Sequence, residues 1–278
     1  MIERRTRWRR ALEVDLPVLL VVCFALAPYA WMIITSLKED NEITHWPLTY
    51  WPKAMTLEHY RYLLERTNFA GNLVNSLIVA LGAAILGLGA SVPAAYSFSR
   101  FRFPGRRLLM IQFLVINMFP VVLLIIPLFV LMRNFGLLDT YYGIILGHST
   151  FAIPFSIWMM SSYMNAIPKE LDEAAMVDGA NRLQTIWRII LPLAMPGIAT
   201  TAIYIFVASW NEYLFAMMLS GPNVRTVTVA LQLFIGEYSV KWGLLTAGGT
   251  LVAIPVTVLF LVVQRRLIGG LTAGAVKS

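Results

Sequence analysis

The feature that most restricts the fold of this chain is a set of six long stretches that contain no Asp, Glu, Lys or Arg. Each stretch has at least 22 residues, and a helix of about 20 residues can cross the ~30 Å hydrocarbon core of a bilayer. The sequence therefore predicts an all-α membrane protein with six transmembrane helices. The predicted spans are Leu16–Leu37, Thr67–Ser99, Leu108–Met132, Thr140–Pro168, Ile189–Asn211 and Trp242–Gln264.

The composition agrees with a membrane protein. Of the 278 residues, 58% are hydrophobic and only 13% are charged, with a mean hydropathy of +0.70, whereas soluble domains have about 25% charged residues. The net charge of +7 lies in short clusters beside the spans, where insertion and anionic lipid favour cations. It therefore indicates contact with membrane lipid and no nucleic-acid partner. The single cysteine, Cys23, lies inside the first span and has no intrachain partner for a disulfide.

The distribution of Lys and Arg predicts the orientation of the spans. With a cytoplasmic N-terminus, the inside segments hold 15 of the 22 cations and the outside segments hold the other 7, as the positive-inside rule requires. Both termini are then cytoplasmic. The predicted organisation is a cytoplasmic N-terminal segment (residues 1–15), a six-helix transmembrane domain (16–264) and a cytoplasmic tail (265–278).

The second span carries small residues at every fourth position. A stripe of this kind lets another helix approach closely. We therefore expect it to be a packing surface with no role in substrate binding. The stripe consists of Ala83, Gly87, Ser91 and Ala95.

The most informative polar segment, about residues 165–192, lies between the fourth and fifth spans. Pro168 suits the first turn of a helix, where its missing N–H costs nothing. Carboxylates are favoured in the same turn by the helix dipole, and three are present: Glu170, Asp172 and Glu173. Apolar residues at helical spacing form a stripe along this predicted helix: Leu171, Ala174, Ala175 and Val177.

A sharp corner and a second helix are expected to follow. Gly179 lies where a left-handed C-cap is needed, so the chain can reverse there. Asn181 can then N-cap a second short helix that runs to Ile190 and is stopped by Pro192. Together these features predict a compact, exposed knob on the cytoplasmic side. An ordinary amphipathic loop lying on the membrane surface is the alternative.

The same segment resembles the EAA loop of bacterial ABC importer permeases. The resemblance rests on Glu-Ala-Ala at 173–175 and on its spacing to Gly179 and to the Leu-Pro pair at 191–192. In that family the loop is the cytoplasmic helix that docks on the ATPase subunit. The resemblance therefore implies a set of ATPase-coupling residues: Glu173, Ala174, Ala175, Asp178, Gly179, Ala180, Ile189, Leu191 and Pro192.

Three polar residues are candidates for lining a transport pathway or forming a gate. Asn117 lies near Pro120, where backbone carbonyls are freed, and a polar side chain inside a span is costly unless it meets a partner or water. A hydrogen bond to another helix is an equal alternative for Asn117. Asn211 and Glu212 lie at the outer end of the fifth span, where they can contact a sugar or form a gate, or equally cap and anchor the helix. His148 is expected to be neutral and hydrogen-bonded.

From the first span to the tail, the chain resembles the smaller permease subunit of carbohydrate-uptake ABC importers of the maltose and trehalose type. Segments 126–146 and 264–278 carry this wider resemblance. It implies the type I ABC importer permease fold, a bacterial inner (plasma) membrane location and a sugar substrate, a disaccharide or oligosaccharide. The implied partners are a second permease subunit, two ATPase subunits and an external substrate-binding protein.

The chain itself is expected to be non-catalytic, with no bound cofactor and no metal site. It lacks the G-x-x-x-x-G-K-[ST] phosphate loop, so ATP and Mg²⁺ are assigned to the ATPase partner. A proton- or sodium-coupled secondary transporter would carry ionisable residues within its spans, whereas the six predicted spans contain no Asp, Glu, Lys or Arg. A membrane enzyme would need a clustered nucleophile or metal set, which the sequence lacks.

Overall fold

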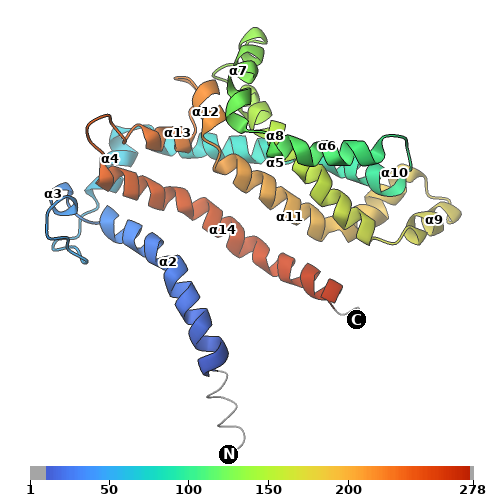
Figure 1. The fold of residues 1–278 in the computed structure, drawn as a ribbon, viewed down its shortest axis with the longest axis horizontal. Helices are drawn as coiled ribbons and strands as arrows, with labels where there is room; N and C mark the ends of the chain where they lie inside the picture. Colours follow the sequence, from blue (N-terminus) through green and yellow to red (C-terminus); the bar gives the residue numbers. More distant parts are fainter. Residues whose placement is uncertain (1–10, 276–278) are drawn as a thin grey trace, which may run out of the picture. The chain divides into compact units, whose positions relative to one another are not determined.

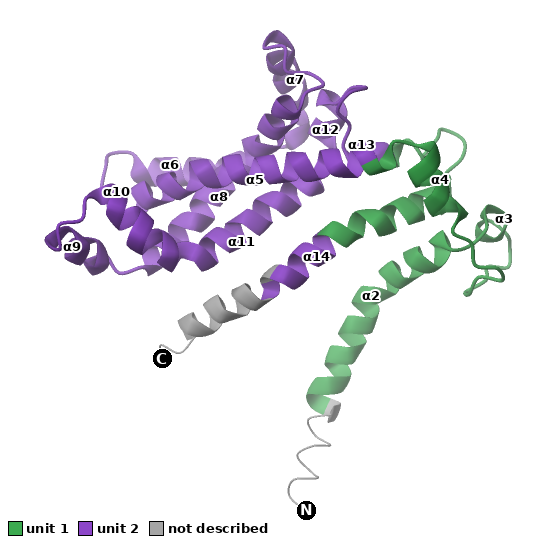
Figure 2. Cartoon of the chain, turned by 180° about the vertical axis from the view of Figure 1, so that it is seen from behind, with its two compact units in different colours: residues 1–70, 231–255 green, residues 71–230, 256–278 purple. Residues whose placement is uncertain are grey.

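The computed structural model describes residues 11–275. Residues 1–10 and 276–278 lie outside the described residues, and with them most of the predicted N-terminal segment and the end of the predicted tail. The chain divides into two compact units (Figure 2): residues 1–70 and 231–255 form unit 1, and residues 71–230 and 256–278 form unit 2. The helical elements are η1 (Ala11–Asp15), α2 (Leu16–Ser36), α3 (Asp40–Ile43), α4 (Glu58–Arg66), α5 (Phe69–Arg100), α6 (Arg106–Met118), η2 (Val121–Leu124), α7 (Ile125–Asn134), α8 (Tyr141–Ala166), α9 (Glu170–Val177), α10 (Arg182–Thr185), η3 (Ile186–Ile190), α11 (Leu191–Trp210), α12 (Leu214–Leu219), α13 (Val227–Gln232) and α14 (Trp242–Ala275).

Unit 1 contains α2, α3, α4 and the first part of α14. Helix α2 is apolar along its whole length, yet only Thr35 and Ser36 at its end are buried. A helix that is apolar all round is stable where lipid or another apolar chain surrounds it, so α2 has the surface of a membrane span. The hydroxyl groups of Ser36 and Tyr60 lie 2.6 Å apart and join the end of α2 to α4.

In unit 2, the long helices α5, α6, α8 and α11 lie side by side, with α9 and α10 at one end and α7 and α12 at the other (Figure 1). The predicted packing role of the small-residue stripe on α5 is confirmed, because Ala83, Ser91 and Ala95 are fully buried. A Cβ atom on Gly87 would lie only 2.6 Å from Cδ1 of Ile205 in α11. Small side chains therefore set the close approach of α5 and α11.

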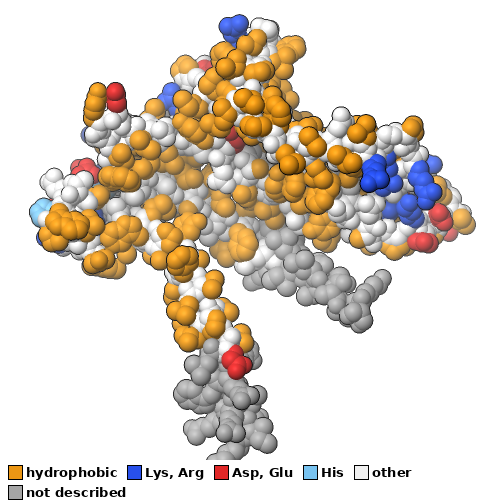
Figure 3. All heavy atoms as spheres, viewed as in Figure 1, with side chains coloured by type: hydrophobic (Ala, Val, Ile, Leu, Met, Phe, Trp, Pro, Cys, Tyr) orange, Lys and Arg blue, Asp and Glu red, His pale blue; other side chains and the backbone are white. Residues whose placement is uncertain are grey.

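Charged and apolar side chains are separated along unit 2. Lys and Arg gather at the end that carries α9 and α10, whereas hydrophobic side chains cover much of the remaining visible face (Figure 3). The cation distribution assigns the α9–α10 end to the cytoplasm. We call it the inner end, and we call the end with α7 and α12 the outer end.

Among residues 11–275, five helical segments are long and apolar enough to cross a membrane, and a bent pair makes a sixth. The prediction of six spans therefore agrees with the structure when this pair counts as one span. The predicted third span is not one straight helix, however, because α6 and the η2–α7 segment meet at 96°. Pro120 explains the break, since a proline drives the preceding residue out of the helical region, and Phe119 has a ψ of 135°.

Pro192 does not stop the second short helix, contrary to the prediction. The chain is helical from Arg182 to Trp210. The π-helical turn η3 ends at Ile190, two residues before the proline, and the N–H of Leu191 donates to the carbonyl of Ile186, five residues back. This wider turn accommodates a residue that has no N–H and whose ring needs space on the preceding turn.

The last helix is longer than predicted. Helix α14 continues through Ala275, beyond the predicted boundary at Gln264. No proline follows Pro255 in the sequence to end the helix. The predicted tail 265–278 therefore begins as a continuation of α14, and its last three residues lie outside the described part of the chain.

Candidate functional site

The inner end carries a short helix, a sharp corner and a second helix, in agreement with the predicted knob. Helix α9 ends in a Schellman motif, in which Ala180 N–H donates to the Ala175 carbonyl at 3.0 Å and Gly179 N–H donates to the Met176 carbonyl at 3.1 Å. Gly179 has a φ of +86°, which glycine adopts without the steric cost of a Cβ atom. The predicted left-handed C-cap is therefore confirmed.

The second helix begins at the predicted N-cap. The Asn181 side chain accepts from the N–H of Gln184, and the Gln184 side chain accepts from the N–H of Asn181, both at 2.9 Å. This capping box pairs two backbone donors that the first turn of a helix leaves free. Because α10 continues through η3 into α11, the corner is joined directly to a transmembrane helix.

The buried face of α9 differs from the predicted apolar stripe. The buried residues are Asp172 and Ala175, which are 7% and 4% exposed. Leu171, Ala174 and Val177 are exposed instead, Val177 to 88%. Helix α9 therefore turns a carboxylate inward and apolar side chains outward, the reverse of the arrangement expected for a helix that faces only water.

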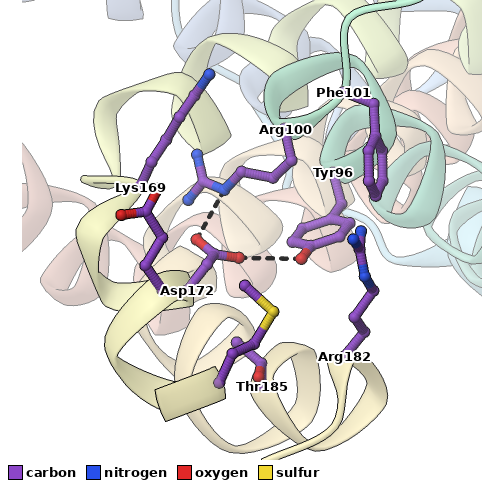
Figure 4. Close-up of a pocket in the computed structure, with 9 residues that line it drawn as sticks. Tyr96, Arg100, Phe101, Lys169, Asp172, Arg182 and Thr185 are labelled. Carbon is purple, nitrogen blue, oxygen red and sulfur yellow. Dashed lines mark hydrogen bonds and ion pairs between the residues drawn. The ribbon is translucent and has the colours of Figure 1, made fainter.

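Asp172 connects three helices at the inner end (Figure 4). Its Oδ2 atom lies 2.8 Å from Nε of Arg100, and its Oδ1 atom accepts a hydrogen bond from the Tyr96 hydroxyl at 3.0 Å. Nη1 of Arg100 donates to the carbonyl of Met164, near the end of α8, at 3.1 Å. The ion pair is buried, with exposed side-chain fractions of 6% for Arg100 and 10% for Asp172. The sequence placed Asp172 in the first turn of a helix but contained no sign of this contact.

A cavity of about 220 Å³ lies beside the ion pair. Lys169, Glu173 and Arg182 contribute to its wall, and Figure 4 shows Arg182 pointing toward Tyr96 and Phe101. The Arg182 guanidinium lies 4.9 Å from the centre of the Phe101 ring, a cation–π geometry. Arg182 therefore joins the start of α10 to the residue that follows α5.

A comparison with known proteins identifies the family. The family described as "Binding-protein-dependent transport system inner membrane component" matches residues 84–272, a range that includes Tyr96, Arg100 and the α9–α10 corner. The chain belongs to this family. It is therefore a multi-pass permease of the inner membrane.

Individual relatives match this permease over nearly its whole length. It is 38% identical over 262 residues to the trehalose transport system permease protein of Mycobacterium tuberculosis, covering 93% of this chain and 95% of that one. It is 37% identical over 264 residues to the trehalose/maltose transport system permease protein of Thermococcus litoralis, covering 94% of each. A chain in the crystal structure of a bacterial ABC transporter involved in the import of alginate superposes with a TM-score of 0.78 at 27% identity, covering 93% of this chain and 97% of that one.

The permease residues that match the EAA pattern fall into two groups. Residues of the first group are exposed on the α9–α10 corner, where they are accessible to another protein, and the group includes the glycine with positive φ. This group consists of Glu173, Ala174, Asp178 and Gly179. The second group is buried or half-buried against the permease itself and consists of Ala175, Ala180, Ile189 and Leu191. Pro192 is exposed in the first turn of α11.

Two candidate pathway residues of the permease bond only to their own helices. Asn117 is exposed on α6 and donates to the Phe113 carbonyl at 2.9 Å, rather than to another described helix. Asn211 is exposed at the end of α11 and donates to the Val207 carbonyl at 2.9 Å. A role for either asparagine in the pathway stays a prediction.

The third candidate, Glu212, caps α12 at the outer end. Its carboxylate accepts from the N–H groups of Phe215 and Ala216, each at 3.0 Å, and lies 3.1 Å from Nε2 of His148. His148 is buried and its Nδ1 shares a hydrogen bond of 2.7 Å with the Ser209 hydroxyl, so the predicted hydrogen bonding of this histidine is confirmed. Burial alone would raise the pKa of Glu212, but His148 and the two N–H donors outweigh burial and hold the pKa below its usual value.

Proposed function

We propose that this permease is one of two membrane subunits of a binding-protein-dependent ABC importer for a sugar, a disaccharide or oligosaccharide. Relatives with 37–38% identity are trehalose and trehalose/maltose permeases, and the solved transporter of similar fold imports a polysaccharide. Sugars are therefore the substrate class that the related proteins favour. Asn117, Asn211 and Glu212 are the candidate pathway or gate residues of this chain.

The α9–Gly179–α10 corner carries this proposal. The buried face of α9 is held on α5 by the contact between Asp172 and Arg100, and Arg100 also bonds to α8. On the opposite face, Glu173 and the apolar side chains of Met176 and Val177 are exposed. A surface of this kind, anchored on one side and free on the other, fits a docking segment for another protein. We assign the ATPase subunit as its partner, because the segment matches the EAA pattern.

The remaining partners complete the transport cycle. ATP and Mg²⁺ bind to two ATPase subunits, and an external protein delivers the sugar. The exposed apolar surfaces of α2 and α6 are available to lipid and to the second permease subunit. Closure of the ATPase pair then shifts the membrane subunits between inward and outward access through the docked corners.

Reversal of the charge at Glu173 tests the docking assignment. Glu173 is exposed, so Glu173→Lys should leave insertion and folding intact. A docking contact made in only one ATPase state would be lost, and sugar uptake by the assembled complex should fall by about tenfold or more. Uptake and ATP hydrolysis would be measured in proteoliposomes that contain all subunits, with sugar binding to the external protein measured in parallel.

The matched control is Glu13→Lys, which reverses an exposed carboxylate outside the α9–α10 corner and should transport normally. Wild-type uptake in Glu173→Lys would indicate that the corner is a passive surface loop and would contradict the docking assignment. Uptake that continues without ATP but stops when a proton or sodium gradient is removed would instead support a secondary transporter.

A further inference from the structure

The buried carboxylate of Asp172 holds the docking helix on the membrane helices. Of the three acids at the start of α9, Asp172 is buried whereas Glu170 and Glu173 are exposed. Both of its oxygens are engaged within α5, one by the Arg100 guanidinium at 2.8 Å and one by the Tyr96 hydroxyl at 3.0 Å. Two contacts from one helix fix both the position and the rotation of α9.

Arg100 extends this connection to a third helix. While Nε pairs with Asp172, Nη1 donates at 3.1 Å to the carbonyl of Met164. This carbonyl, near the end of α8, also accepts from the N–H of Ile167 at 3.3 Å. The planar guanidinium makes these bonds in a fixed relative geometry. A displacement of α9 therefore acts on the inner ends of both α5 and α8.

Stability alone explains this arrangement poorly. Desolvation of two charges offsets much of their attraction, so that apolar residues of similar size often stabilise a protein equally well or better. In addition, Nη2 of Arg100 is buried without a hydrogen-bond partner among the described residues, which is itself unfavourable. Polar contacts that join α9 to α5 and α5 to α8 fix the relative positions of these helices more specifically than an apolar contact would.

We propose that Asp172, Arg100 and Tyr96 form a latch, a set of positioning residues that transmits movement of α9 to α5 and α8. The proposal rests on the proposed docking of α9 to an ATPase subunit. Loss of the latch should leave the ATPase docked and hydrolysing ATP, while the membrane helices follow its movement less completely. The quantity that reports the latch is therefore the amount of sugar imported per ATP hydrolysed.

Asp172→Asn removes the charge with little change in shape and should lower sugar import per ATP by about tenfold. Tyr96→Phe removes one hydrogen bond and keeps the ion pair, so it should lower the ratio by a smaller factor, about twofold to fivefold. Asp172→Glu retains the carboxylate and should keep most of the wild-type ratio. Glu170→Gln, which removes an exposed carboxylate from the same turn of α9, is the matched control and should behave as wild type.

All variants would be measured as complete complexes in proteoliposomes, with the ATPase subunit in each complex quantified. Unchanged import per ATP in Asp172→Asn would overturn the latch, as would an equal loss in Glu170→Gln. If Asp172→Asn fails to assemble, Tyr96→Phe decides, because a purely structural role predicts fewer complexes with an unchanged ratio. The proposed function fails separately, if the wild-type chain recruits no ATPase subunit or imports sugar without hydrolysing ATP.

Discussion

At the inner end of unit 2, Asp172 binds side chains of another helix, whereas at the outer end Glu212 and Asp139 bind mainly backbone N–H groups. Glu212 caps α12. Asp139 accepts from the side chain of Asn223 at 2.7 Å and from the N–H of Val224 at 2.8 Å. Glu212 and Asp139 therefore hold backbone turns in place, at the start of α12 and in the loop before α13, while Asp172 binds side chains of another long helix. We expect the contact between helix side chains at the inner end to transmit movement of α9 to α5.

The partner cations differ as well. Asp172 at the inner end pairs with the guanidinium of Arg100, whereas Glu212 at the outer end lies beside the buried imidazole of His148. We expect perturbations at the outer end to act on stability and pH dependence, and perturbations at the inner end to act on coupling.

The largest effect on stability is expected from Glu212→Ala. This change removes the cap of α12 and leaves the buried His148 without its carboxylate partner, with a loss of about 3 kcal/mol in unfolding free energy. Thermal unfolding of the detergent-solubilised protein would measure it. Asn211→Ala, at an exposed neighbouring position that bonds only to its own helix, should cost less than about 0.5 kcal/mol.

The pH dependence of stability provides a second test of the role of Glu212. The pKa of Glu212 lies below its usual value, so its stabilising contribution is complete above that usual value and is lost as the pH falls through the lowered pKa. The difference between wild type and Glu212→Ala should therefore narrow in acid. A difference that stays constant as the pH falls would mean that the carboxylate charge is not what stabilises the outer end.

A smaller effect, confined to the inner end, is expected from Gly179→Val. The φ of +86° costs a β-branched residue about 1–2 kcal/mol, enough to weaken ATPase binding by about tenfold. Apart from Gly179 and its two chain neighbours, no atom of the described chain lies within 4 Å of a Cβ built on Gly179, so backbone strain rather than a clash is the cause. Gly179→Asn, which tolerates this conformation, is the matched variant, and titration of the ATPase subunit is the measurement. Equal weakening by both variants would assign the effect to bulk in the docking surface.

Local sequence signals predicted much of this inner corner, and their limits have a physical explanation. Gly179 and Asn181 were predictable because a left-handed turn and a capping box depend on residues within one turn of the chain. The burial of Asp172 was not, because its partner Tyr96 lies 76 residues earlier and nothing beside Asp172 distinguishes it from Glu173. The predicted helix end at Pro192 was wrong, since the π turn that accommodates this proline has no clear signature in the sequence.

The smallest effect is expected from Asp139→Asn at the outer end. Asp139 has a φ of +55°, and asparagine adopts this conformation with little strain, so the substitution tests the charge alone. Burial would raise the pKa of Asp139, but the N–H donors of Val224 and Asn223 and the Asn223 amide hold it below its usual value.

The amide introduced by Asp139→Asn would accept fewer of these hydrogen bonds and would turn an NH₂ group toward backbone donors, with a loss of about 1 kcal/mol near neutral pH. Because a carboxylate with a lowered pKa stabilises the fold above its usual pKa and loses this contribution as the pH falls through the lowered one, the two proteins should converge in acid. Thermal unfolding at neutral and acidic pH measures both quantities. Sugar import per ATP should be unchanged, because Asp139 joins the segment before α8 to the loop after α12 at the outer end and makes no contact with α9. A fall in sugar import per ATP would contradict the proposal that the inner end transmits movement whereas the outer end only stabilises structure.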